Sequence, residues 1–212
     1  MQPATDPSAA PALDEAAPGA ATRKRPRPGE RRVQILQVLA QMLEQPGAER
    51  VTTAALAARL EVSEAALYRH FASKAQMFEG LIDFIESTVF GLINQISERE
   101  ADGRARAARI VAMVLQFGEK NPGMTRVMVG DALVFEHERL QQRMNQFFDR
   151  IESTLRQCLR ATTAASSTPT VDAQVAANVL TAFVVGRLQG YARSGFRRLP
   201  TEHLEASLAL ML

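Results

Sequence analysis

Residues 51–78 hold side chains that can contact phosphates and the edges of bases. Hydroxyl groups at the start of short helices suit phosphate oxygens, because free backbone N–H groups gather there. Tyrosine and histidine add groups that can reach base edges. We expect Thr52, Thr53, Ser63 and Lys74 to hold phosphates, and Glu64, Ala65, Tyr68 and His70 to face the groove, with Arg69 as a further contact.

Two short helices joined by a tight break must position these side chains. In the first, Thr52 or Thr53 can cap the helix N-terminus, and apolar residues recur at helical spacing. The second begins at Ser63, and Leu67 and Phe71 pin it against the first. This layout predicts a helix-turn-helix whose second helix enters the major groove of double-stranded DNA. The alternative is an ordinary helical hairpin with a solvated outer face, and the residue types at the helix ends favour DNA.

Charge is distributed unevenly at the N-terminus, although the net charge is only +2. Residues 1–22 hold three acids and no base, and their Ala- and Pro-rich composition predicts disorder. Six bases then crowd residues 23–32. Such a run is typical of a mobile, solvated segment, but beside a helix-turn-helix it can lie along phosphates. We assign residues 1–28 to an N-terminal arm with a basic end.

The rest of the chain predicts helices only, so we expect an all-α fold with a DNA-binding domain at 29–76 and a helical C-terminal domain at 77–212. The helix from residue 73 is apolar on two sides, which predicts that it packs between two bodies. The first helix of the chain is predicted at 29–44, and its apolar stripe consists of Val33, Ile35, Leu36, Leu39 and Met42. The other predicted helices span 73–99, 105–120, 124–129, 131–160 with a bend near 136–137, 171–194 and 201–212, and a polar linker is predicted at 161–169.

Other chemistry has little support in this sequence. The single cysteine, Cys158, lies in an apolar helical pattern and is typical of a small core residue. His70, His137 and His203 lie far apart with no ligand spacing, so we expect no metal and no cofactor. We find no run of about 18 apolar residues and no signal peptide, so we expect no membrane span and a cytoplasmic protein. An enzyme is the class that we favour least.

Several motifs resemble those of TetR-family regulators. The TTAALA, VSEAALYRHF and SKAQMF segments are similar to the N-terminal domain of that family over about residues 30–78. A narrower resemblance, to nucleoid occlusion factors with this fold, adds FGEKNPGMTR and RLQQRMNQFFDRIE and covers most of 30–160. The resemblance implies a homodimer on palindromic DNA that is associated with the nucleoid. It also implies capture of the C-terminal tail of the tubulin-like protein FtsZ, which blocks assembly of the division ring.

The resemblance further implies a groove for the FtsZ tail between the helices at 73–99 and 105–120. An apolar floor with a basic and amide rim suits a short peptide that has hydrophobic and acidic residues. The alternative is that Phe84 and Met113 are core and that Lys120 is a solvated helix end. Leu92 stands where similar proteins lead us to expect a base, so the rim is less positive here. The candidate residues are Phe84, Met113, Gln116, Lys120 and Asn121.

One side of the helix at 171–194 predicts a dimer interface. It combines apolar residues with glycines, which permit a partner helix to approach closely. The final amphipathic helix needs a cover, and a two-fold bundle of both helices from each chain supplies it. The candidate residues are Val175, Val179, Ala182, Phe183, Gly186 and Gly190, with Leu204 and Leu208 on the final helix.

A second function is open at this point, namely a transcriptional repressor controlled by a small-molecule effector. Its C-terminal helices would enclose a pocket, and filling the pocket would change the spacing of the two recognition helices. At helical spacing such apolar residues are more often core than pocket. The possible lining is Met113, Phe117, Met128, Phe135, Met144, Phe147 and Phe148.

Overall fold

The computed structural model describes residues 29–45, 51–160, 162 and 169–212, and over these residues the fold is all-α, as predicted. The predicted arm at 1–28 and most of the linker at 161–169 lie outside the described residues. The elements are α1 (Glu30–Leu43), α2 (Thr53–Arg59), α3 (Glu64–Tyr68), α4 (Lys74–Arg99), α5 (Gly103–Lys120), α6 (Pro122–Met128), the 3₁₀ helix η1 (Asp131–Leu133), α7 (Glu138–Arg160), α8 (Pro169–Arg193) and α9 (Leu204–Met211).

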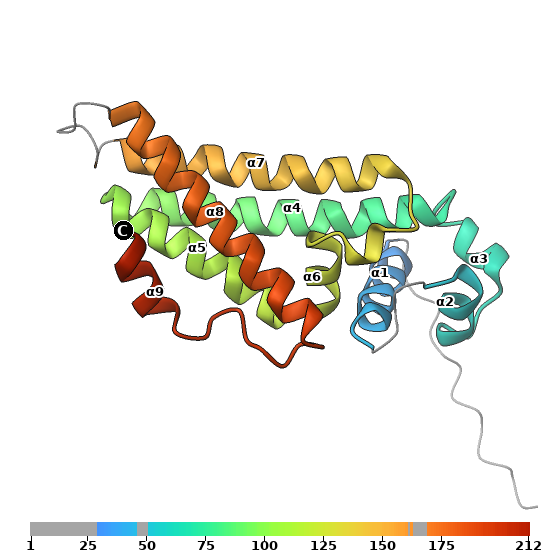
Figure 1. Ribbon diagram of the computed structural model, residues 1–212. Helices are drawn as coiled ribbons and strands as arrows, with labels where there is room; N and C mark the ends of the chain where they lie inside the picture. Colours follow the sequence, from blue (N-terminus) through green and yellow to red (C-terminus); the bar gives the residue numbers. More distant parts are fainter. Residues whose placement is uncertain (1–28, 46–50, 161, 163–168) are drawn as a thin grey trace, which may run out of the picture.

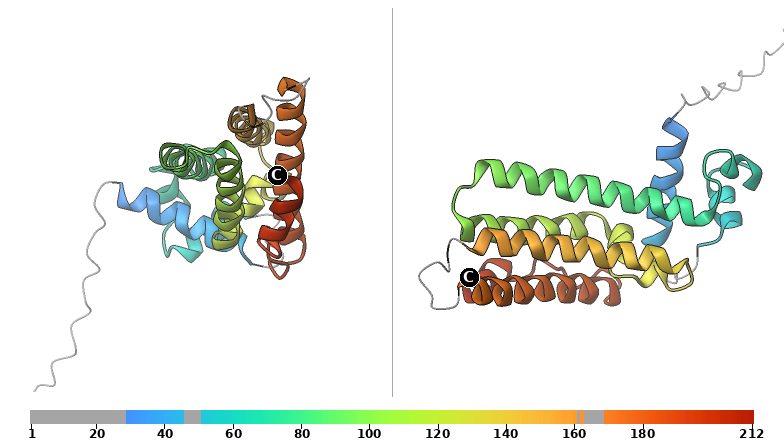
Figure 2. Two further views of the ribbon diagram at one scale, coloured as in Figure 1. Left: turned by 90° about the vertical axis from the view of Figure 1, so that its left-hand side faces the viewer. Right: turned by 90° about the horizontal axis from the view of Figure 1, so that it is seen from above.

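The long helices α4, α5, α7 and α8 pack together as a bundle, in which α4 and α7 run side by side and α8 lies at an oblique angle to them (Figure 1). Helix α1 crosses near one end of this bundle, and α2 and α3 lie beyond α1 at the N-terminal end of α4 (Figure 2). Helix α6 packs against α1, α4, α5 and α8. It therefore joins the three N-terminal helices to the bundle.

Helix α4 is buried along most of its length. Ser73 caps it, since its Oγ accepts a hydrogen bond from the N–H of Gln76 at 3.2 Å. Phe78 and Val89, three helical turns apart, are each at most 1% exposed. Both predicted apolar sides are largely buried, but Phe84 is 48% exposed and Ile96, near the end of the helix, is only partly buried. The predicted domain boundary at 76/77 falls within the first turn of this helix.

Three details of the predicted helices are wrong. Val33 is 55% exposed, because the buried face of α1 follows Ile35, Leu39 and Leu43 at four-residue spacing. The range 131–160 is not one helix, since η1 and a break precede α7. The last helix starts at 204 rather than 201, because His203 has a φ of 51°, which ends regular helical geometry on its N-terminal side.

Gly123 brings α6 very close to α1. A Cβ atom at this position would lie 2.0 Å from the carbonyl oxygen of Ala40, so only glycine fits the contact. On the other side of α6, the buried Thr125 Oγ1 donates to the carbonyl oxygen of Gly118 in α5 at 2.8 Å. The two contacts fix α6 between the N-terminal helices and the bundle.

Ion pairs run between α4 and α7. Arg143 Nη2 lies 2.6 Å from Glu86 and 2.5 Å from Asp83, and Arg139 Nη2 lies 2.8 Å from Glu79. The hydrogen bonds that Arg143 donates to Glu86 raise the pKa of Arg143 most, against the opposing effect of burial. Further along, the guanidinium of Arg150 stacks on the ring of Phe90 at 3.8 Å. These contacts set the register of the two helices.

We predict that Gly123→Ala lowers the free energy of unfolding by about 1–3 kcal/mol, because the new methyl group meets backbone that cannot rotate away. This corresponds to a fall in Tm of about 2–12 °C. Gly91→Ala is the matched control in α4, where a Cβ meets nothing within 4 Å. It should stabilise the helix by up to about 1 kcal/mol. Thermal and urea unfolding at one protein concentration measure both effects, and an unchanged Gly123→Ala protein would contradict the close contact.

Candidate nucleic-acid interface and partner surfaces

Helices α2 and α3 form the predicted helix-turn-helix. Thr52 Oγ1 accepts a hydrogen bond from the N–H of Ala55 at 3.1 Å, and Ser63 Oγ accepts one from the N–H of Ala66 at 3.3 Å. Between the helices, Glu61 takes a left-handed φ of 55°, which makes the turn tight. Both hydroxyl groups cap helices, so a phosphate at these two positions would meet mainly backbone N–H groups.

Helix α3 presents a polar face to solvent. Glu64, Ala65, Tyr68 and Arg69 are exposed, and the exposed fraction of Tyr68 is 46%. Thr53 Oγ1 donates to Glu64 Oε2 at 2.6 Å, which joins the start of α2 to the start of α3. The Thr53 hydroxyl group therefore positions the Glu64 carboxylate, in addition to the role at a phosphate that the sequence predicts for Thr53.

Arg32 ties the end of α3 to α1. Its Nη1 donates to the carbonyl oxygen of His70 at 2.6 Å, and its guanidinium lies 4.1 Å from the ring centroid of Phe71. His70 follows the end of α3 and is half-buried, so it is less accessible than Tyr68. Arg32 belongs to the basic run at 23–32, and no local sequence pattern indicates this tertiary contact.

Lys74 differs most from its expected position among the candidate DNA contacts. Its Nζ forms an ion pair with Glu136, in the connection between η1 and α7, rather than extending freely into solvent. The side chains are 25% and 10% exposed, so the pair is partly buried. Sequence analysis missed Glu136, because 62 residues separate it from Lys74.

The candidate groove residues on α4 and α5 do not all lie in the core. Phe84 is half-exposed, so the alternative interpretation of Phe84 as a core residue is wrong, whereas Met113 packs against the core. Gln116 and Lys120 are exposed. Asn121 is held by its own helix, since its Nδ2 donates to the carbonyl oxygen of Phe117 at 2.7 Å.

Gln116 borders a surface depression of about 490 Å³ that also includes residues of the α8–α9 connection and of α9. Thr201 and Leu204 lie in its wall. The side chain of Gln116 is therefore next to α9 as well as on the surface of α5. This neighbourhood could not be anticipated from the spacing of residues 113, 116 and 120.

Helix α8 leaves an apolar face uncovered in the single chain. Val175 is 56% exposed and Val179 is 47% exposed. Cβ atoms built at Gly186 and Gly190 would meet nothing within 4 Å, and Phe183 is half-buried beneath Arg187. The α8 part of the dimer interface stays a prediction, and its candidate residues remain accessible in the single chain.

The α9 part of the predicted interface needs correction. Leu204 and Leu208 are each only 9% exposed and belong to the core of their own chain. Leu210 is 90% exposed on another side of the same helix. The sequence showed one apolar side of α9, but not which body covers it.

The residues suggested as lining of an effector pocket mostly fill the core. Phe117, Met128, Met144 and Phe147 are at most 8% exposed, and the rings of Phe90 and Phe147 pack edge to face at a centroid distance of 5.5 Å. Phe135 is instead 67% exposed. The buried side chains of this set pack against one another and against the helices around them.

Cys158 is buried, as expected for a small core residue. Burial raises the pKa of its thiol, although nearby Arg106 acts in the opposite direction, so a reactive thiolate is disfavoured. Within the part of the chain that the structure describes, no three side chains of the metal-ligating types come together.

Comparison with known proteins gives two family matches and a set of similar sequences. Residues 35–81 match the family described as bacterial regulatory proteins, tetR family, and residues 102–212 match the SlmA-like, tetracyclin repressor-like C-terminal domain. The nucleoid occlusion factor SlmA of Idiomarina loihiensis is 50% identical over 85% of this chain and 93% of its own length. SlmA of Vibrio atlanticus is 49% identical over 91% of this chain and 97% of its own length.

Solved structures with this fold are more distant in sequence. The TetR family regulator PfmR of Thermus thermophilus has a TM-score of 0.69 at 22% identity, over 84% of this chain and 97% of its own. A TetR-family regulator from Bordetella parapertussis has a TM-score of 0.68 at 16% identity, over 87% and 95%. The chain has the fold of TetR regulators, and about half of its aligned residues are identical to those of SlmA proteins. It therefore belongs to the SlmA family of nucleoid occlusion factors.

Proposed function

We propose that this protein is a nucleoid occlusion factor in the cytoplasm that binds chromosomal DNA as a homodimer. From these sites it binds the C-terminal tail of FtsZ and blocks assembly of the division ring over the nucleoid. The observation that carries the proposal is the identity of about half the residues with SlmA proteins across most of the chain. Separate sets of exposed residues support the proposal for DNA, for the dimer and for the FtsZ tail.

Double-stranded DNA is the partner that the helix-turn-helix supports. The exposed face of α3 carries Tyr68 and Arg69 beside Glu64 and Ala65, so it can enter a major groove without rearrangement. Backbone N–H groups at the starts of α2 and α4 can donate hydrogen bonds to phosphates on either side. The palindromic site follows from two-fold symmetry, with half-sites about 34 Å apart.

The dimer accounts for the apolar face of α8. Contrary to the sequence-based expectation, the segment Thr170–Arg193 is long and apolar enough to cross a membrane, by length and composition only, and 33% of its 18-residue apolar window is buried. A helix–helix interface explains the same composition, since one side packs on the chain's own core and the other on a partner helix. Gly186 and Gly190 permit the two backbones to approach closely.

The surface of α4 and α5 is the seat that we assign to the FtsZ tail. Phe84 supplies an exposed aromatic ring, and Lys120 supplies an exposed cation on the neighbouring helix. Gln116 adds an amide to the same helix. A short peptide with apolar and acidic side chains matches this combination.

A map of chromosomal binding sites distinguishes this function from an effector-controlled repressor. An occlusion factor should occupy many sites scattered over the chromosome, whereas a repressor should occupy one or a few near its own gene. The burial of Phe117, Met144 and Phe147 in the core does not favour an effector pocket. Occupancy at only a few promoters would contradict the proposal.

We predict that Tyr68 and Arg69 affect DNA binding differently. Tyr68→Ala should weaken binding to the specific palindrome about 10- to 100-fold and leave binding to a random duplex nearly unchanged, because it removes a base contact. Arg69→Gln should weaken both complexes alike and reduce the salt dependence, because it removes a phosphate contact. Fluorescence anisotropy over a salt series measures both, and equal losses on both duplexes from the two variants would contradict this division.

We predict that Val179→Glu gives monomers. The side chain is half-exposed in the single chain, so the change should leave the fold intact while burying an unpaired charge in the interface. Phe183→Glu should act in the same way. Val33→Glu, at an exposed position on α1, is the control that should stay dimeric. Sedimentation velocity gives the mass, and a stable Val179→Glu dimer that still binds the palindrome would place the interface elsewhere.

We predict that Lys120→Asp abolishes binding of an FtsZ tail peptide and leaves DNA affinity within about twofold, because the side chain lies outside the DNA-reading helices. Arg104→Asp is the control, with the same charge change at the opposite end of α5. It should keep peptide binding. Calorimetric titration with and without a duplex gives both affinities. Full peptide binding by Lys120→Asp would exclude this surface, and loss of DNA binding with it would indicate misfolding.

A further inference from the structure

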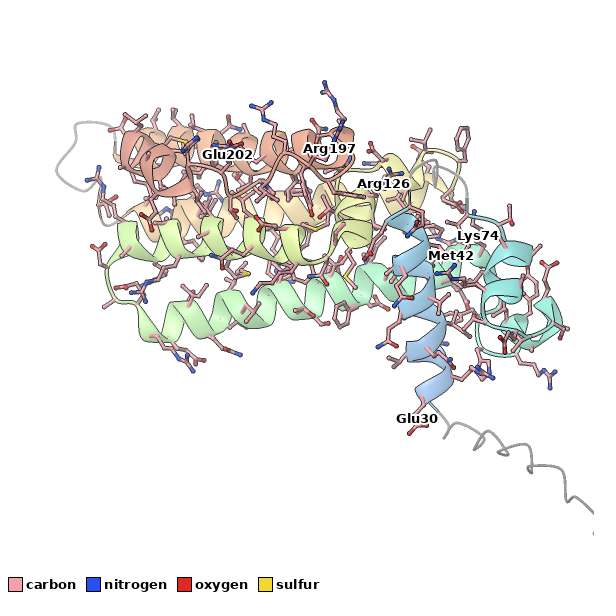
Figure 3. The ribbon with its side chains drawn as sticks, turned by 90° about the horizontal axis from the view of Figure 1, so that it is seen from below. Glu30, Met42, Lys74, Arg126, Arg197 and Glu202 are labelled. Atoms are coloured by element: carbon pink, nitrogen blue, oxygen red, sulfur yellow. The ribbon has the colours of Figure 1, made fainter. Side chains whose placement is uncertain are left out.

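The ion pair between Lys74 and Glu136 joins two distant parts of the chain. Lys74 is the first residue of α4, directly after the helix-turn-helix, and Figure 3 labels it where α4 meets α2 and α3. Glu136 lies in the connection between η1 and α7 and is only 10% exposed. A carboxylate that is this far buried depends on its cation, because burial penalises an unpaired charge.

The same ammonium group is well placed for a DNA phosphate. It stands at the N-terminus of α4, where free N–H groups and the helix dipole also attract an anion. A phosphate that reaches Lys74 approaches the carboxylate of Glu136. Two anions at one ammonium repel each other, so gaining the phosphate contact weakens the ion pair.

Glu136 is also the side chain that anchors its own segment. In the stretch 134–137, Val134 is 70% exposed, Phe135 is 67% exposed and His137 is exposed, whereas the Glu136 side chain is only 10% exposed. The backbone of this stretch makes only short-range hydrogen bonds among the described contacts, such as Glu136 N–H to the carbonyl oxygen of Leu133 at 3.0 Å. Among the described polar contacts, the ion pair with Lys74 is what joins this stretch to α4.

We propose that Glu136 competes with DNA phosphate for Lys74, so that binding of a duplex breaks the ion pair and loosens segment 134–137. The ion pair keeps the DNA-free protein closed at this junction and lowers its affinity for every duplex, regardless of sequence. Glu136 is thus a determinant of DNA affinity although it contacts no DNA. The proposal rests on the DNA-binding part of the proposed function and not on FtsZ.

The first experiment is a double-mutant cycle on DNA affinity. Glu136→Gln should tighten binding to specific and random duplexes alike, by about five- to tenfold at moderate salt, because Lys74 no longer has to leave a carboxylate. Glu138→Gln is the matched control, since it removes the same charge from an exposed position two residues away. It should change affinity less than about twofold. In a Lys74→Met background, Glu136→Gln should have no effect.

An equal effect of Glu136→Gln and Glu138→Gln would mean that general electrostatics, and not the ion pair, sets the affinity. If Glu136→Gln tightened DNA binding by the same factor in the Lys74→Met background, the proposal would be overturned as well. If no variant and no wild-type protein binds DNA, the proposed function fails instead. These outcomes are distinguishable in one set of titrations.

The second experiment does not depend on the stability of Lys74→Met. Amide hydrogen exchange of the peptide covering 134–137 should become faster when a saturating duplex is added to the wild-type protein. In Glu136→Gln the exchange should be equally fast with and without DNA. Unchanged or slower exchange in the wild-type complex would show that the ion pair survives on DNA and would overturn the proposal.

Discussion

Burial of α4 along most of its length is the constraint on which the rest of the structure depends. Its first turns complete the core of the helix-turn-helix, and its later turns lie inside the bundle. Because one continuous helix serves both cores, the orientation of α3 is fixed relative to α5, α7 and α8. Gly123 in α6 reinforces this arrangement by its close contact with α1.

Charge is used differently along the length of α4. Arg139 and Arg143 of α7 pair with acidic side chains of α4 and fix the register of two helices in the bundle. At the DNA-binding end the charges are exchanged: α4 contributes the base, Lys74, and the acid is Glu136, in the connection before α7. The first pairs join two helices of the bundle at partly exposed positions, whereas the more buried Lys74 pair stands at the N-terminus of α4, where we propose that phosphates compete for the cation.

The single chain leaves three kinds of surface available, and each suits a different partner. The polar face of α3 suits DNA, the apolar and glycine-containing face of α8 suits a second copy, and the mixed surface of α4 and α5 suits a short peptide. They lie on different helices of the chain. Under the proposed function, DNA, a second copy and the FtsZ tail would therefore bind at surfaces that different helices form.

The sequence by itself determined where the helices form and which residues lie on the exposed polar face of α3. Capping residues such as Ser63 and Ser73 and the repeat of apolar positions act over a few residues, so the start of α4 and the layout of the helix-turn-helix could be predicted. Only the tertiary structure decided which side of a helix is covered. Val33 and Leu204 look alike in local pattern, yet one is exposed and the other buried, because burial depends on helices far away in the chain. For the same reason, the partner of Lys74 became visible only when folding brought residues 74 and 136 together.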